Sequence, residues 1–277
     1  MTTNRLLPGR LSRVRTDLVL SPFGAGTDEM LAAARMADAG GFDRVWTFDH
    51  VSGGLAGRSW SRDPFTMMGA IAATTKRVGV GVLVANMMNR HPAQLALAVN
   101  TLQALAPGRV ACGLGAGAAP GSRFAREHVA MGVVLGGAEA RSRRLVETIA
   151  CLGAVWRGET FIGDDVVVNG LTGVIDGAPL PPIIVGAASA SLVRVATAHA
   201  DGVNLRRGPS LPALVELARH LAPGSDFEVS VFDRLDTDHP EGGDIEPLAD
   251  LGVNHRTLAV SSPYPFAAIE RVATTVS

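Results

Sequence analysis

Short apolar runs alternate with longer helical patterns along this chain. Runs of about five β-prone residues are each followed by 10 to 15 residues with helical spacing of apolar positions, which indicates parallel strand and helix units. Strands are predicted at residues 17–20, 44–47, 78–84, 110–114, 183–185, 202–205, 227–232 and 256–260. Helices are predicted at 27–39, from 64 onward, and at 92–105, 137–156, 189–200, 211–221, 245–251 and 265–276.

Eight such pairs favour a single (β/α)8 TIM barrel over an open doubly wound sheet, which usually has five or six units. The chain is therefore interpreted as one domain over residues 1–277, with an N-terminal extension at 1–15. A glycine- and proline-rich excursion at 157–182 precedes the fifth strand. Thr27 is the expected N-cap of the first helix. In such a barrel, functional side chains follow the C-terminal ends of the strands.

The second predicted strand runs into Phe48, Asp49 and His50, which places an imidazole and a carboxylate at the barrel mouth. A histidine there can act as a general acid or base near neutral pH, or can hydrogen-bond a heterocycle. The alternative is a histidine that only caps a loop. Met87 and Met88 follow the third strand, where they either line an apolar pocket or simply pack.

Glycines follow two further strands. Gly113, Gly115 and Gly117 resemble a phosphate loop, but Ala118 stands where the fingerprint needs a third glycine, so they indicate close approach of backbone to a ligand or a neighbour. Residues 186–189 lead directly into a helix, whose N-terminal N–H groups could bind a phosphate. The alternative is an ordinary capped helix.

Composition excludes several classes of function. Twenty-five basic and 26 acidic residues leave a net charge of -1, which argues against a nucleic-acid or anionic-membrane partner. A signal-peptide pattern and an 18-residue apolar stretch are both missing from the sequence, so a cytoplasmic protein is expected. Cys112 and Cys151 lie in apolar surroundings and are interpreted as core residues.

Lys76 is the only lysine, and it precedes the third strand at the end of the barrel opposite the mouth. Schiff-base and pyridoxal phosphate chemistry are thereby excluded. Any anion at the mouth must be held by Arg206, Arg207 or backbone N–H groups. The metal-binding motifs His-x-His and His-Glu-x-x-His do not occur, acidic residues do not gather at successive strand ends, and no metal is expected.

Five segments resemble the bacterial luciferase-like superfamily in order and spacing. They are residues 41–50 (GFDRVWTFDH), 90–94 (RHPAQ), 107–117 (PGRVACGLGAG), 181–186 (PPIIVG) and 200–202 (ADG), and the resemblance spans roughly residues 15 to 205. This family is a TIM barrel that binds FMN or the deazaflavin coenzyme F420 at its mouth. The resemblance implies either flavin monooxygenation or hydride transfer.

The branch that uses F420 carries an Asp-His pair that Asp49 and His50 match, with His50 as the acid or base and Asp49 orienting it. The resemblance also implies a non-proline cis peptide in the third strand, at the Gly81–Val82 bond, which buttresses the deazaflavin ring. The positions matched to cofactor binding are Asp49, Gly81, Val82, Val84, Asn86, Ala116, Gly117, Val185, Gly186, Ala187 and Leu205.

The chain departs from this branch at three points. Ala118 stands where the similar glucose 6-phosphate dehydrogenases have an acidic residue, lysine does not occur after Lys76, and Ala187 replaces a second glycine. A sugar phosphate substrate is therefore disfavoured. The expected protein is a homodimeric F420-dependent oxidoreductase that moves a hydride between the deazaflavin and a small, apolar organic substrate. The alternatives are an FMN-dependent monooxygenase and a barrel that binds a flavin or deazaflavin without turnover.

Overall fold

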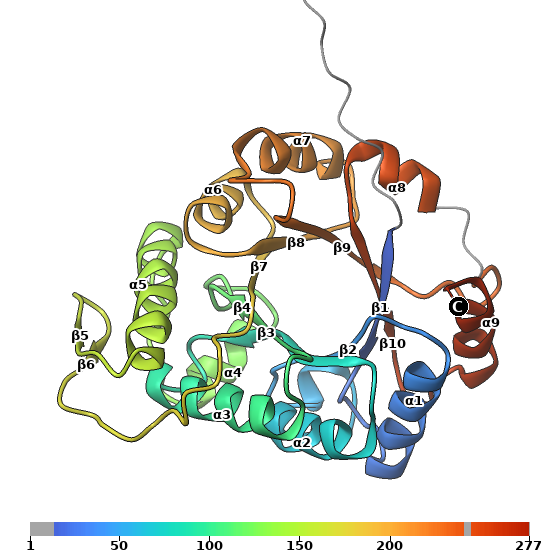
Figure 1. The fold of residues 1–277 in the computed structure, drawn as a ribbon, viewed down its shortest axis with the longest axis horizontal. Helices are drawn as coiled ribbons and strands as arrows, with labels where there is room; N and C mark the ends of the chain where they lie inside the picture. Colours follow the sequence, from blue (N-terminus) through green and yellow to red (C-terminus); the bar gives the residue numbers. More distant parts are fainter. Residues whose placement is uncertain (1–13, 241–244, 277) are drawn as a thin grey trace, which may run out of the picture.

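The computed structural model describes residues 14–240 and 245–276, which form a closed (β/α)8 barrel (Figure 1). All eight barrel strands pair in parallel in the order in which they occur along the chain, and the last strand closes the barrel against the first. The strands are β1 (Arg15–Leu20), β2 (Arg44–Thr47), β3 (Gly79–Asn86), β4 (Val110–Gly115), β7 (Ile183–Ala187), β8 (Gly202–Arg206), β9 (Glu228–Arg234) and β10 (His255–Val260).

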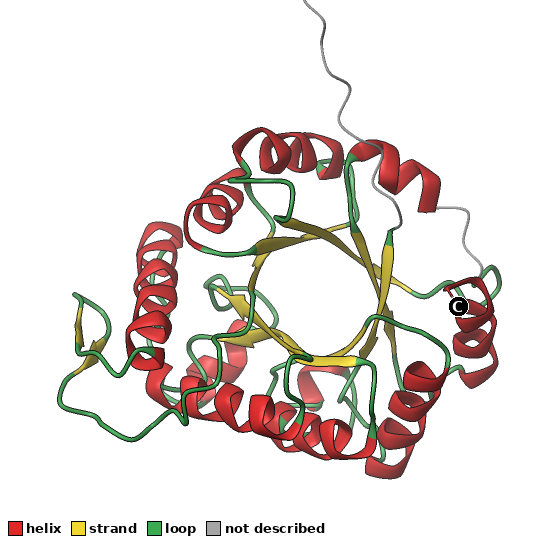
Figure 2. Ribbon diagram, viewed as in Figure 1, coloured by secondary structure: helices red, strands yellow, loops and turns green. Residues whose placement is uncertain are grey.

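Helices surround the barrel in a ring (Figure 2). They are α1 (Thr27–Ala39), α2 (Pro64–Thr74), α3 (Pro92–Leu105), α4 (Ala125–Ala130), α5 (Ala138–Trp156), α6 (Ala190–His199), α7 (Leu211–Leu221), α8 (Ile245–Leu251) and α9 (Phe266–Val276). The predicted eightfold pattern is confirmed. The predicted N-terminal extension falls mainly on residues 1–13, outside the described residues, and Arg15 already belongs to β1.

Side chains alternate between two cores because successive residues of a strand point to opposite faces. On β1, Leu18 and Leu20 pack into the core between the barrel wall and the helices, whereas Val19 points into the lumen. There it contacts a cluster that includes Trp46 and Leu83. The lumen is therefore filled with side chains, as is usual for this fold.

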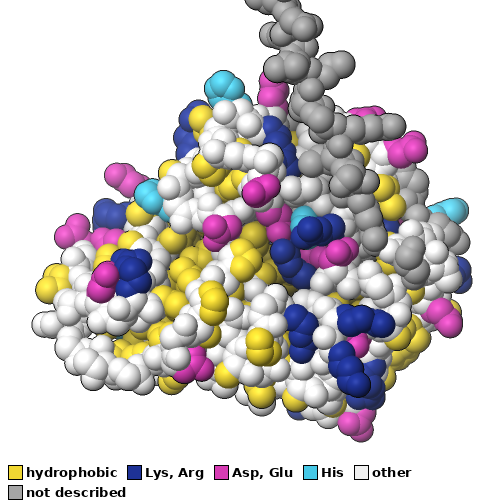
Figure 3. All heavy atoms as spheres, in the orientation of Figure 1, with side chains coloured by type: hydrophobic (Ala, Val, Ile, Leu, Met, Phe, Trp, Pro, Cys, Tyr) yellow, Lys and Arg dark blue, Asp and Glu magenta, His cyan; other side chains and the backbone are white. Residues whose placement is uncertain are grey.

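Cys112 and Cys151 are buried and unlinked, as expected for core residues. Burial raises the pKa of the Cys112 thiol to about 12, so this thiol stays protonated at neutral pH. Among the described residues, no helix is long and apolar enough to cross a membrane. On the face drawn in Figure 3, acidic and basic side chains intermingle with hydrophobic ones.

The excursion at residues 157–182 lies along the outside of the helical ring (Figure 1). It contains a small antiparallel hairpin, β5 (Phe161–Ile162) and β6 (Val167–Val168). Its second half is tied to α3, because Asn100 donates a hydrogen bond to Asp176 at 2.9 Å and Gln103 donates one to the carbonyl of Pro179 at 3.0 Å. These bonds fix the segment on the flank of the barrel.

Two local expectations need correction. Thr27 is the first residue of α1 rather than its N-cap, and Gly26 takes the cap position because the carboxylate of Glu29 accepts its N–H at 3.4 Å. Helix α4 was not predicted. It has only six residues and lies in the loop after β4, too short a stretch to show helical periodicity.

Candidate functional site

Asp49 anchors the segment that follows β2 to the segment that follows β3. Its buried carboxylate accepts the backbone N–H of Asn86 at 2.8 Å and pairs with the guanidinium of Arg90 at 2.5 and 3.1 Å. The amide of Asn89 donates a further bond at 3.1 Å. Both oxygens are thus engaged, and Asp49 fixes the shape of the barrel mouth at this point.

His50 contacts a different carboxylate. Its Nδ1 lies 3.1 Å from Oε2 of Glu127 on α4, while Oε1 of Glu127 accepts the backbone N–H of Ser52 at 3.0 Å. Glu127 is buried, with 3% of its surface exposed. The prediction that Asp49 orients His50 is therefore wrong, since Glu127 does so. Nothing in the sequence pattern singles out Glu127, because it is 77 residues from His50 and belongs to no motif.

The Glu127 contact determines which ring nitrogen of His50 carries a hydrogen. An ionised carboxylate can only accept hydrogen bonds, so Nδ1 must be the donor in this pair. In the neutral ring Nε2 is then the acceptor, free to take a proton from a reacting group. The side chain of His50 is 23% exposed, which leaves it accessible from the mouth.

Aromatic rings surround His50. The ring of Phe124 stacks on it with centroids 4.1 Å apart, and Phe23 lies 5.5 Å away. The ring of Phe48, which directly follows β2, lies next to that of Phe232 on β9, with centroids 5.9 Å apart. A mouth lined in this way favours flat or apolar groups over strongly hydrated ones.

Asn86 links β3 to α4. Its Nδ2 lies 3.0 Å from Nε2 of His128, and its Oδ1 accepts the backbone N–H of Met88 at 3.0 Å. Burial lowers the pKa of His128, against an opposing effect of Glu127. A neutral imidazole can accept the hydrogen bond from the Asn86 amide, so the two groups suit one another. Of the two methionines, Met87 is fully buried and serves packing, while Met88 is only partly buried.

The cis peptide of β3 lies two residues beyond its predicted place, at Leu83–Val84 rather than Gly81–Val82. Gly81 and Val82 pair regularly with both neighbouring strands, and the register shifts only between Val82 and Ala85. A Cβ on Gly81 would lie 2.3 Å from the carbonyl oxygen of Ala111 and 2.4 Å from the ring of Trp46. Gly81 therefore makes room for the backbone of β4 and for the ring of Trp46 deep in the lumen, below the mouth.

The glycines at the ends of β4 and β7 make room for the side chain of Val84. A Cβ on Gly115 would lie 2.5 Å from Cγ2 of Val84, and one on Gly186 would lie 2.8 Å from Cγ1. The close approach predicted from the glycines is therefore to a neighbouring side chain. Gly117 has a φ of +74°, a conformation that requires glycine, and it lies against Met88.

Several predicted cofactor contacts have side chains that point away from the lumen. They pack in the core between the barrel wall and the helices and can offer a ligand only their backbone: Val82, Val185, Ala187 and Leu205. Ala116 is also buried, at the end of β4. Asp49, Val84, Asn86 and Gly186 lie at the mouth itself.

Hydrogen-bond donors gather where β7 and β8 end. Ser189 caps α6, with Oγ accepting the N–H of Leu192 at 3.5 Å, and its hydroxyl lies 2.9 Å from that of Ser191. Both serines are exposed. Arg206, the exposed last residue of the neighbouring strand β8, lies on the same face of that strand as Asn204, which bonds to Ser230 inside the lumen.

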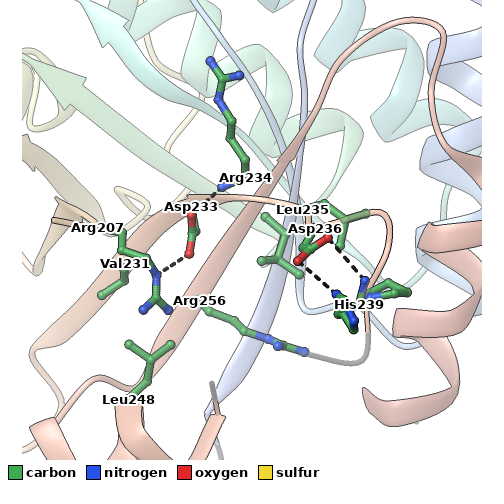
Figure 4. Close-up of a pocket in the computed structure, with 11 residues that line it drawn as sticks. Arg207, Val231, Asp233, Arg234, Leu235, Asp236, His239, Leu248 and Arg256 are labelled. Carbon is green, nitrogen blue, oxygen red and sulfur yellow. Dashed lines mark hydrogen bonds and ion pairs between the residues drawn. The ribbon is translucent and has the colours of Figure 1, made fainter. Parts of the chain in front are cut away.

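Arg207 lies on the outer face of the barrel instead. It forms an ion pair with Asp233 and lines a cavity of about 260 Å³ between the barrel wall and α8, together with Arg256 and Leu248 (Figure 4). Of the two arginines predicted to hold an anion at the mouth, only Arg206 is therefore on the appropriate side of the sheet.

A second group of ionisable residues lies at the opposite, N-terminal end of the lumen. Asp17 of β1, Glu228 of β9 and His255 of β10 are buried there beside Arg44 of β2. Burial alone would raise the pKa of Asp17, but the close approach of His255 at 3.6 Å and the charge of Arg44 outweigh it and lower that pKa. The sequence gives no sign of this group, because its members are spread over the whole chain.

Comparison with known proteins identifies the family. The model of the luciferase-like monooxygenase family matches residues 11–225. The F420-dependent glucose-6-phosphate dehydrogenase of Beutenbergia cavernae is 31% identical over 199 residues, covering 68% of this chain and 57% of the relative. The F420-dependent hydroxymycolic acid dehydrogenase of Mycobacterium tuberculosis is 30% identical, covering 67% and 51%. The chain thus matches about half the length of these relatives.

Two solved structures share the fold over nearly the whole chain. An F420-dependent secondary alcohol dehydrogenase in complex with an F420–acetone adduct has a TM-score of 0.79 at 19% identity, with 96% of this chain and 99% of that chain covered. The oxygenating constituent of 3,6-diketocamphane monooxygenase from Pseudomonas putida, in complex with FMN, has a TM-score of 0.73 at 16% identity, with 95% and 98% covered. The match to the family model over most of the chain shows that it belongs to the luciferase-like monooxygenase family, and the closed barrel agrees with this.

Proposed function

We propose that this protein is an F420-dependent oxidoreductase that transfers a hydride between the deazaflavin and a small, uncharged organic substrate. The observation that carries the proposal is the pairing of His50 with the buried carboxylate of Glu127 at the barrel mouth. The names of the relatives from Beutenbergia cavernae and Mycobacterium tuberculosis, both F420-dependent dehydrogenases, support the choice of cofactor.

The donors at the mouth suit a flat cofactor with an anionic tail. The hydroxyls of Ser189 and Ser191 and the guanidinium of Arg206 stand where β7 and β8 end, beside the N-terminus of α6. They would hold the anionic groups, while Val84, Phe48 and Phe232 would pack against an aromatic ring. When bound, the deazaflavin supplies or accepts the hydride.

The protein's own contribution is to move a proton. Glu127 holds Nδ1–H of His50, so Nε2 can accept a proton from a substrate hydroxyl, or return one to a carbonyl oxygen in the reverse direction. The carboxylate also stabilises the imidazolium that forms, because the two groups are in direct contact. His50 is thus the proposed acid or base, and Glu127 is a positioning residue.

Glu127 also accounts for the departure at position 118. The resemblance places an acidic residue there, and this chain has Ala118. Helix α4 brings a carboxylate to the same mouth from nine residues further along the chain, and that carboxylate contacts His50. We propose that Glu127 takes over the role of the missing acid.

The mouth also indicates the class of substrate. Its walls are aromatic, and the only lysine, Lys76, precedes β3 at the other end of the barrel. An apolar wall without lysine is poorly suited to a sugar phosphate but suits a small alcohol or ketone. One solved F420-dependent enzyme with this fold is a secondary alcohol dehydrogenase, which supports the same class.

Titration of the purified protein with F420 and, separately, with FMN tests this proposal. We expect F420 to bind with micromolar or better affinity, and to bind more weakly to an Arg206→Ala variant. Tighter binding of FMN would favour a monooxygenase, as in the FMN-bound relative of this fold. Failure of both cofactors to bind below high micromolar concentration would overturn the assignment as an enzyme.

We also propose a homodimer, as the resemblance implies. Helix α3 exposes half of the surface of two leucines eight residues apart, Leu97 and Leu105, and apolar side chains on one helical face are suited to a partner surface. Sedimentation velocity should show a dimer for the wild-type protein and a monomer for a Leu97→Glu, Leu105→Glu variant. A wild-type monomer at micromolar concentration would contradict this proposal.

A further inference from the structure

The N-terminal end of the barrel lumen holds three potential metal ligands that the proposed reaction does not use. Asp17, Glu228 and His255 come from β1, β9 and β10, and they are 0%, 7% and 3% exposed. One potential ligand atom from each residue lies within 4.8 Å of those of the other two. This group, called the floor cluster below, is at the opposite end of the barrel from His50.

Neighbouring side chains bind only part of each carboxylate of the floor cluster. Oδ2 of Asp17 accepts the indole N–H of Trp46 at 2.8 Å, and Oε2 of Glu228 accepts a guanidinium N–H of Arg44 at 2.7 Å. Oδ1 of Asp17, Oε1 of Glu228 and Nδ1 of His255 are buried and have no hydrogen-bond partner among the described residues. Three ligand atoms, one per residue, thus make no hydrogen bond, although the two carboxylates are held in place by Trp46 and Arg44.

The distances inside the floor cluster are too long for hydrogen bonds. Nδ1 of His255 lies 3.6 Å from Oδ1 of Asp17, whereas a hydrogen bond between such atoms is about 2.7–3.2 Å. Two ligands of one tetrahedral metal ion at about 2.0–2.2 Å are roughly 3.3–3.6 Å apart. Nε2 of His255 lies 3.5 Å from Oε2 of Glu228, which is also longer than a hydrogen bond.

Charge also favours a cation at this place. The two carboxylates and the guanidinium of Arg44 leave one net negative charge in a buried site when His255 is neutral. A buried charge without a partner is costly. Arg44 contacts Oε2 of Glu228 and approaches Oδ2 of Asp17, so the unpartnered oxygens of both residues stay open to a second cation.

We propose that the floor cluster binds one divalent transition-metal cation through Asp17, Glu228 and His255, with solvent completing the coordination. One imidazole nitrogen and two carboxylate oxygens suit Zn²⁺, which is the probe for this site. The sequence argued against metal chemistry at the mouth, and the site lies at the other end, where residues of this fold serve stability. The ion would therefore hold β1, β9 and β10 together rather than take part in hydride transfer.

The test is calorimetric titration of the chelator-treated protein with Zn²⁺, in the absence of F420. We expect one ion per chain, and at about 100 times the dissociation constant a rise in Tm of about 5 °C or more. The fluorescence of Trp46 provides a local readout, because its indole N–H bonds to Asp17. It is read in a Trp60→Phe, Trp156→Phe background, so that only Trp46 emits.

Ligand variants and a surface control make the test specific. His255→Gln and Glu228→Gln should each weaken Zn²⁺ binding by 10-fold or more, with folding checked by circular dichroism. His239→Gln is the control, since this histidine is 84% exposed on the surface and should leave binding unchanged. If one ligand variant fails to fold, the other variant and the Trp46 emission still test whether the floor cluster binds Zn²⁺.

Three results would overturn the proposal. They are the absence of any Zn²⁺ binding, binding that survives both ligand variants, and binding that is lost in His239→Gln. The first would mean that a proton on His255 balances the charge of the floor cluster instead. Because F420 is left out and the site is remote from His50, failure here would leave the proposed oxidoreductase activity untouched.

Discussion

The carboxylate of Glu127 holds the imidazole of His50 at 3.1 Å, although the two residues lie 77 positions apart in the chain. Glu127 reaches His50 from α4, a helix of six residues in the loop after β4. The buried carboxylate fixes the hydrogen on Nδ1 and leaves Nε2 as the acceptor. The geometry of the proposed proton transfer thus depends on how α4 is docked over the barrel mouth.

Replacing Glu127 with Gln should therefore slow turnover. The neutral amide can still hydrogen-bond the ring but no longer stabilises the imidazolium, so we expect kcat to fall about 10-fold or more and the pH–rate profile to shift. Steady-state kinetics across pH measures both effects. Glu139→Gln, an acidic residue in the first turn of α5, is the matched control. An unchanged profile in Glu127→Gln would remove Glu127 from the mechanism.

Replacing Asp49 with Asn should mainly destabilise the protein. It breaks a largely buried ion pair and leaves Arg90, whose side chain is 17% exposed, without its charge partner. The expected loss is about 3 kcal/mol of the free energy of unfolding, measured by urea denaturation. The exposed pair of Arg157 and Glu159 provides the contrast, and Glu159→Gln should leave the midpoint unchanged.

If Asp49 instead oriented His50, its replacement would shift the pH–rate profile while the urea midpoint stayed in place. An Asp49→Asn, Arg90→Leu double variant sharpens the comparison. Its loss of stability should be smaller than the sum of the two single losses, because no unpaired charge remains. A simple sum would contradict the coupling seen in the structure.

Adding a methyl group at Gly186 should disturb the mouth through Val84. The new Cβ of Gly186→Ala would lie 2.8 Å from Cγ1 of Val84, and overpacking of this kind costs about 1–3 kcal/mol. Val84→Ala should recover much of that loss in the double variant. Gly208→Ala is the control, since its Cβ would meet nothing within 4 Å. Thermal unfolding of these three variants measures the effect, and equal losses of stability in Gly186→Ala and Gly208→Ala would contradict the expected clash with Val84.

Stability should decline on acidification partly because of His128. Burial lowers its pKa in the folded protein, whereas the unfolded chain titrates near the ordinary value of about 6.5. Below that pH the unfolded state binds a proton that the folded state does not, so the free energy of unfolding falls as the pH drops toward the folded pKa. His128→Gln should remove part of this pH dependence. Urea denaturation between about pH 5 and 8, a range that extends to both sides of the ordinary histidine pKa of about 6.5, measures it. His199→Gln, on α6, should retain it.

The barrel could be predicted from the sequence because its signals are local. Each strand and most helices show their own apolar periodicity, and five helices or strands have the predicted bounds, among them α1 (Thr27–Ala39) and β2 (Arg44–Thr47). The position of His50 followed from the same pattern, since residues after a strand of this fold lie at the mouth.

The partners of these residues could not be predicted, because they depend on contacts between distant segments. Glu127 meets His50 only when α4 docks, and Asp17, Glu228 and His255 meet only when the barrel closes. Only the resemblance points to a cis peptide at Gly81–Val82, and the structure has it at Leu83–Val84. Gly81 is required instead by the carbonyl oxygen of Ala111 and the ring of Trp46, contacts that spacing along β3 does not reveal.

Anaerobic turnover with F420 tests the central claim most directly. The purified protein is mixed with oxidised F420 and a panel of small secondary alcohols, and the loss of the visible absorbance of the deazaflavin is followed. We predict that F420 is reduced by at least one alcohol, and that His50→Ala slows this reduction by about 100-fold or more. Persistent F420 absorbance with every alcohol, together with turnover of reduced FMN and oxygen by the same preparation, would contradict the account.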